Sequence, residues 1–132
     1  MRFTEHELTA ALTGAAKTVL AARRKDVRRG QVDVDAAWDA LDRYQRFQLL
    51  DGLGTELLPV LVALPDVEVA VGTRPSYTDD QVRETVEAVL GETGGRLRRA
   101  VLVRARTALV QAALAHVPPR QDPDALIVPD HL

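Results

Sequence analysis

The chain contains no cysteine, and this absence excludes disulfide bonds, thiolate catalysis and every zinc site that uses cysteine. It has one serine, Ser76, and no G-x-S-x-G motif surrounds it, so the pattern of a serine nucleophile is also missing. The longest apolar run, from Leu57 to Pro65, is far shorter than the ~20 residues that a membrane helix needs. The first residues lack the basic start and unbroken apolar stretch of a signal peptide. We therefore expect a soluble, cytoplasmic protein with no membrane partner.

Asparagine is absent as well, isoleucine occurs once, at Ile127, and two lysines stand against fifteen arginines. These three scarce residue types have AT-rich codons, which indicates the codon bias of a GC-rich bacterial genome. Part of the arginine content therefore has a mutational origin. An arginine cluster is for that reason weaker evidence for a nucleic-acid partner here than in a chain of ordinary composition.

With 132 residues the chain has room for one domain and one hydrophobic core. The spacing of its apolar residues predicts a mainly α fold, a single-domain bundle of four to five helices over residues 1–117. Residues 118–132 hold four of the seven prolines, which rules against a further helix there. We expect this segment to be an extended tail that packs on the domain or on a partner.

Capping and breaking signals set the expected helix boundaries. The motif T-x-x-E at Thr4 and the motif T-x-x-Q at Thr78 are capping boxes, in which side chain and backbone at a helix start satisfy each other's hydrogen bonds. Gly52 and Gly54 predict a break between two helices. The expected helices span about residues 4–24, 35–50, 56–64, 79–90 and 96–116, with Asp35 and Thr55 as caps of the second and third.

One segment has the alternation of a strand. Val67, Val69 and Val71 recur with a period of two, which is typical of a strand with one buried face. A strand needs a partner, and residues 30–34 or 125–128 could supply it. The same alternation occurs in extended loops, so a small two-stranded edge and a plain connection both remain open.

The charges are segregated along the chain. Residues 1–30 have a net charge of +4, residues 31–95 of −9 and residues 96–132 of +3, with a total of −2. We expect the basic first and last helices to lie beside the acidic middle and neutralise it, within one chain or across a dimer. An acidic balance overall argues against a dedicated binder of polyanions.

Two basic clusters are nevertheless candidate sites for an anionic or nucleic-acid partner, because arginine side chains bind phosphate oxygens in pairs. The first cluster consists of Arg23, Arg24, Lys25, Arg28 and Arg29, and the second of Arg96, Arg98 and Arg99. No aromatic residue is interleaved to stack bases, and no helix-turn-helix pattern surrounds either cluster. Cations at a helix C-terminus are also favoured by the helix dipole alone. Nucleic-acid binding is therefore an alternative hypothesis.

A small-ligand pocket is a second alternative, with Trp38, Tyr44, Arg74 and Tyr77 as candidate lining residues. Such a pocket would belong to a small-ligand or metal-dependent enzyme. However, the three histidines form no H-E-x-x-H pattern, and the aspartates of residues 33–42 lack the spacing and central glycine of a calcium loop. We therefore predict no metal site and no cofactor.

The last helix carries two apolar stripes at helical spacing. Leu97, Val101 and the alanines at 105, 108 and 112 form the wider stripe, which we expect to cover the core. The second stripe consists of Val103, Val110 and Leu114, and it needs another cover, either the centre of the bundle or a second subunit. This second stripe and the missing catalytic residues favour a non-enzymatic interaction module. Its partner is expected to be another copy of itself or another protein.

Overall fold

The computed structural model describes residues 1–92 and 94–121, and this part of the chain is mostly helical. It contains six helices and no strand within those ranges. The helices are α1 (Glu5–Arg23), α2 (Lys25–Arg28), α3 (Val34–Ala40), α4 (Arg43–Ala63), α5 (Asp79–Leu90) and α6 (Arg96–Ala115).

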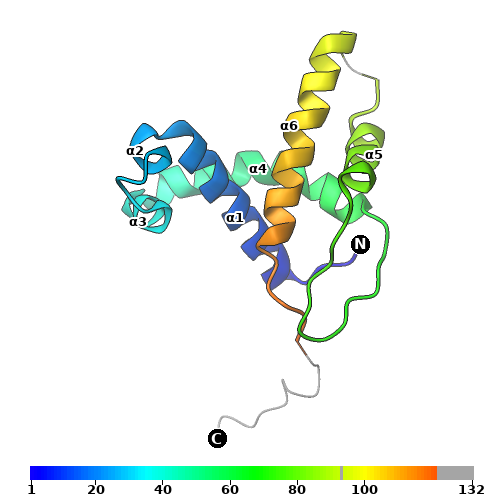
Figure 1. The fold of residues 1–132 in the computed structure, drawn as a ribbon, viewed down its shortest axis with the longest axis horizontal. Helices are drawn as coiled ribbons and strands as arrows, with labels where there is room; N and C mark the ends of the chain where they lie inside the picture. Colours follow the sequence, from blue (N-terminus) through cyan, green and yellow to red (C-terminus); the bar gives the residue numbers. More distant parts are fainter. Residues whose placement is uncertain (93, 122–132) are drawn as a thin grey trace, which may run out of the picture.

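The helices pack around α1, α4 and α6, which contact one another pairwise (Figure 1). The short helices α2 and α3 lie at one end of this group and contact α1, whereas α5 lies at the other end against α4 and α6. The first turns of α6 extend beyond the layer formed by α1 and α4, and α5 lies beside the middle of α6. This first half of α6 therefore has more exposed surface than an ordinary core helix.

Three helices begin with a capping box. The two expected from the sequence are present: Glu7 N–H donates to Thr4 Oγ1 (3.1 Å) in α1, and Gln81 N–H donates to Thr78 Oγ1 (3.1 Å) in α5. The third, at Asp42 before α4, was not predicted. Because each box satisfies two N–H groups that a helix start leaves unpaired, these residues fix where the helices begin.

The predicted second and third helices are wrong in their boundaries. Residues 34–40 form a separate short helix capped by Asp33 rather than Asp35, and α4 then runs unbroken through Gly52, Gly54 and Pro59. A helical glycine costs only about 1 kcal/mol and a helical proline about 3 kcal/mol. Burying a leucine or valine gains about 1.5–3 kcal/mol. The buried face of α4 contains Leu53, Leu57, Val60 and Leu61, so packing outweighs the local breakers.

Residues 67–71 form no strand, so within the described residues the alternating valines lie in an extended connection between α4 and α5. The far part of this connection is held by the end of the described chain: Gly72 N–H donates to the Arg120 carbonyl (2.8 Å), and Arg120 N–H donates to the Thr73 carbonyl (2.7 Å). Residues 125–128, one of the two segments considered as a strand partner for residues 67–71, lie outside the described residues, as does most of the expected tail.

The side chain of Arg120 also binds the start of α1. Its Nε donates to Glu7 Oε2 (3.1 Å), and Glu7 is only 5% exposed. Glu7 at the same time accepts the backbone N–H of Thr4 on its other oxygen (2.8 Å). One carboxylate thus caps α1 and connects it to a residue 113 positions later in the chain.

Helix α1 approaches the end of α6 closely at Gly14. Gly14 is buried there, and a Cβ placed on it would lie 2.1 Å from His116 Cγ and 2.4 Å from His116 Cβ. Ala11, about one turn before Gly14, and Ala15, next to Gly14 in the sequence, are buried as well. Small residues on α1 therefore set the distance between the two helices.

We expect Gly14→Ala to lower the free energy of unfolding by about 1–3 kcal/mol, the usual cost of overpacking a tight core. The clash cannot be relieved by a rotamer change alone, because His116 Cβ is fixed to the backbone. Urea unfolding followed by circular dichroism measures the change.

The matched control is Gly52→Ala, also at a helical glycine, where an added methyl group would have no atom within 4 Å. This variant is expected to gain about 0.5–1 kcal/mol, because alanine favours a helix over glycine. If Gly14→Ala is as stable as Gly52→Ala, the close packing of α1 on α6 is contradicted.

Candidate functional site

The structure does not bring the two predicted basic clusters together. Residues 23–29 lie at the end of α1 and on α2, whereas Arg96, Arg98 and Arg99 lie at the start of α6, at a separate extremity of the fold (Figure 1). Within the first cluster, Arg24 Nη2 forms an ion pair with Asp26 Oδ2 (2.6 Å). This hydrogen bond lowers the pKa of Asp26. Binding of nucleic acid or another anionic partner by these residues stays a prediction.

The predicted pocket is wrong, because its four residues lie at opposite ends of α4. Tyr44 is in the first turn of α4, while Tyr77 donates its hydroxyl to the carbonyl of Pro65, just after the last turn (2.7 Å). A helix of 21 residues separates the two positions by roughly 30 Å at ~1.5 Å per residue. Trp38 is buried on α3, and Arg74 donates to the carbonyl of Ala115 (2.6 Å).

The second stripe of α6 lies at the centre of the bundle, which is one of the two covers considered for it. Val103, Val110 and Leu114 are buried against the other helices of the same chain, so a second subunit does not cover them. The stripe expected to cover the core is exposed instead: Leu97 is 84% and Val101 67% accessible. Periodicity identifies apolar faces, but it does not say which of two faces meets the core.

A groove of about 620 Å³ lies between α5 and α6. Its apolar lining comes from Ala100, Val103 and Ala108 of α6. Its charged lining comes from both helices: Asp79, Arg83 and Glu87 on α5, and Arg96, Arg99 and Arg104 on α6. Arginines outnumber carboxylates two to one around it, so an open groove with an apolar base has a basic margin.

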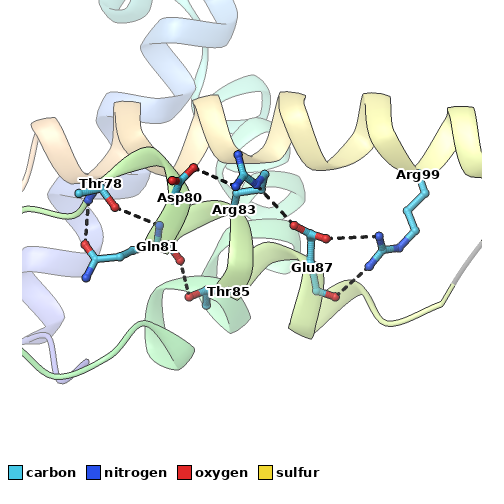
Figure 2. A network of polar contacts seen from close by, with 7 residues as sticks. All are labelled: Thr78, Asp80, Gln81, Arg83, Thr85, Glu87 and Arg99. Carbon is cyan, nitrogen blue, oxygen red and sulfur yellow. Dashed lines mark hydrogen bonds and ion pairs between the residues drawn. The ribbon is translucent and has the colours of Figure 1, made fainter.

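Two of these arginines are engaged by Glu87 (Figure 2). Glu87 Oε1 lies 3.6 Å from Arg83 Nε, and Glu87 Oε2 lies 3.6 Å from Arg99 Nη1. Arg83 pairs in addition with Asp80 (2.8 Å), and Arg99 Nε donates to the carbonyl of Gly91 (3.0 Å) at the end of α5. The pairs of Arg83 lie within α5, whereas the contacts of Arg99 hold α5 against α6 at one end of the groove.

The other end is held by Gln111. Its Nε2 donates to the carbonyl of Tyr77 (3.0 Å) and to Asp79 Oδ1 (3.0 Å). Between the two ends, Thr107 Oγ1 is buried and has no hydrogen-bond partner among residues 1–92 and 94–121. Within the same residues, Arg96 and Arg104 form neither an ion pair nor a side-chain hydrogen bond. Arg96 and Arg104 therefore present donors to the groove that this part of the chain does not satisfy, whereas the Thr107 hydroxyl is covered.

Sequence reasoning missed most of the groove. It named Arg96 and Arg99, but not Arg83, Glu87, Arg104 or Thr107. The signal was available as helical spacing, since residues 79, 83 and 87 share one face of α5, and residues 96, 100, 104, 107, 108 and 111 share one face of α6. What the sequence did not show is that these two faces lie opposite each other.

Neither a metal centre nor a membrane-spanning helix is found in the described part of the chain. No group of three or more histidine, aspartate or glutamate residues there is arranged to hold a metal ion. None of the helices α1 to α6 has the length and apolar character required to cross a membrane. Comparison of the chain with models of known protein families, with curated proteins and with solved structures finds no match.

Tyr77 has a structural role that can be measured. Burial raises the pKa of its phenol, and the nearby Asp66 carboxylate raises that pKa further. The unfolded chain ionises Tyr77 at its ordinary pKa of about 10, so rising pH favours the unfolded state from that value upward. We expect the free energy of unfolding to fall above about pH 10 in the wild type and to fall less in Tyr77→Phe.

At pH 7 the same variant should lose about 1 kcal/mol, because the Pro65 carbonyl loses its donor. Tyr44→Phe removes a hydroxyl from an exposed ring and is expected to change stability by less than ~0.5 kcal/mol at pH 7. Urea unfolding at several pH values gives both results. Equal slopes above pH 10 in wild type and Tyr77→Phe would show that Tyr77 is not the titrating group.

Proposed function

We propose that this chain is a non-enzymatic interaction module that self-associates, with the outer face of α6 on one copy packed on the outer face of α4 on another. The outer face of α6 comprises Leu97, Val101, Leu102 and Ala105, all exposed. The exposure of Leu97 and Val101, on the half of α6 that extends beyond α1 and α4, is the observation that carries the proposal.

Single exposed apolar residues are ordinary on protein surfaces, whereas a contiguous group indicates a contact site. Leu97, Val101 and Ala105 follow one another at a spacing of four, so they form a continuous ridge on successive turns. Covering Leu97 and Val101 would gain about 1.5–3 kcal/mol for each side chain. Alanine at the end of the ridge nearer the middle of α6 allows another helix to approach closely.

Charge argues against packing α6 on α6 of a second copy. The helix contains five arginines and no acidic residue, so two copies of it would repel each other. An apolar surface without a net positive charge is a better partner, and α4 has one. Its outer face comprises Tyr44, Phe47, Asp51 and Val62, all exposed. The two arginines of α4, at 43 and 46, are balanced by Asp51 and Glu56, and no arginine or lysine lies between Phe47 and Ala63. Exposed aromatic residues are enriched in protein interfaces.

Two variants test this pairing. Val101→Arg places a charge on the outer face of α6, and Phe47→Arg places one on the outer face of α4. Each is expected to weaken self-association at least about ten-fold, because an unpaired charge in an apolar contact costs more than about 1.4 kcal/mol. Size-exclusion chromatography with light scattering, over a range of protein concentrations, measures the oligomeric state.

An equal mixture of the two variants is the decisive sample. Each contributes the face that the other has lost, so the mixture should form heterodimers although neither variant associates alone. Val71→Arg is the matched control, since Val71 is 60% exposed and lies in the connection between α4 and α5, away from both faces. A monomeric wild type refutes self-association, and a mixture that stays monomeric refutes the pairing of α6 with α4.

A further inference from the structure

The groove between α5 and α6 supports an inference that does not depend on self-association. We infer that this groove binds a small amphiphilic anion, a carboxylate or a phosphate monoester with an apolar body. The anionic group lies against the guanidinium of Arg104, and the apolar body lies along Ala100 and Ala108. Nothing in the interaction module proposed above uses these residues.

The dimensions of the groove match this class of ligand. Its volume of about 620 Å³ falls within the range of about 300–1,000 Å³ found for small-molecule sites. From Thr107 back to Ala100 the helix rises roughly 10 Å at ~1.5 Å per residue. A medium-length alkyl chain or an aromatic ring with a short linker covers that distance. A free inorganic ion would leave the apolar lining unused.

The charges around the groove select an anion. Glu87 is already paired with Arg83 and Arg99, and Asp79 already accepts the amide of Gln111, so both carboxylates are occupied. Arg104 has no such partner among the described residues, and neither has Arg96 at the end of the groove. A carboxylate or phosphate that enters the groove is therefore attracted by arginines whose charge is not neutralised. An ammonium group would find no free carboxylate among the described lining residues, because Glu87 and Asp79 are already paired.

Titration of 15N-labelled protein with octanoate, octyl phosphate, inorganic phosphate and octylammonium, each below micelle formation, tests the inference. Octanoate or octyl phosphate is expected to shift amide resonances of α5 and of residues 96–111, and comparison of the two identifies the preferred anionic group. Inorganic phosphate should bind at least about ten-fold more weakly, because it buries no apolar surface. Octylammonium should not bind there.

Three variants assign the contacts. Arg104→Gln should weaken binding about ten-fold or more, as expected for the loss of a charged hydrogen bond. Thr107→Val should change affinity less than about two-fold, because its hydroxyl oxygen is covered. Thr107→Val should not lower the melting temperature, because it removes an unsatisfied hydroxyl and keeps the shape of the side chain. Arg98→Gln is the matched control, an exposed arginine of the same helix outside the groove, and should change affinity less than about two-fold.

The inference is overturned if neither octanoate nor octyl phosphate shifts the groove resonances, or if Arg104→Gln and Arg98→Gln weaken binding equally. It is also overturned if inorganic phosphate binds as tightly as octyl phosphate, because the apolar lining would then have no part. The Val101→Arg variant separates this site from the proposed self-association. It should bind the anion as the wild type does, whatever its oligomeric state.

Discussion

The close packing of α1 on the end of α6 is the constraint on which the rest of the structure depends. Gly14 leaves no room for a side chain beside His116, so the two helices meet at a fixed point near the C-terminus of α6. Val117 is buried just beyond this point, and Arg120 then reaches Glu7 and the connection at residues 72–73. Because α6 is anchored at this end, its other half extends past α1 and α4 and depends on α5 for support.

The segregation of charge seen in the sequence serves partly to hold the chain together. Basic side chains of the first and last thirds pair with the acidic middle at Lys17–Asp35 (2.8 Å) and Arg99–Glu87 (3.6 Å). Both pairs are accessible to solvent, and such pairs contribute at most about 1 kcal/mol each. The Arg120–Glu7 pair differs because Glu7 is nearly inaccessible and caps α1 as well. Charge pairing therefore orients the helices, while apolar burial supplies most of the stability.

The sequence predicts the helical class and several helix starts, because capping boxes are local signals. Thr4 and Thr78 cap the helices expected of them. The prediction fails where a distant contact overrides a local signal. Gly52 and Gly54 predict a break, but burial of the apolar face of α4 keeps the helix continuous through both glycines. The prediction fails also for the wider stripe of α6, since Leu97 and Val101 are exposed and the other helices of the chain lie on the side of Val103. The candidate groove could not be predicted for the same reason, because it forms only where a face of α5 lies opposite a face of α6.

Helix α6 presents a different surface in each of three directions, and this division separates the two proposed sites. Val103 and Val110 face the core, Val101 is on the outer face, and Arg104 lines the groove. These positions follow from a rotation of about 100° per residue. A ligand that bridges α5 and α6 stabilises only the folded arrangement of that half of α6, by an amount that grows with its concentration relative to its dissociation constant. Because the groove and the outer face use different residues of α6, a substitution in one of them leaves the contacts of the other in place.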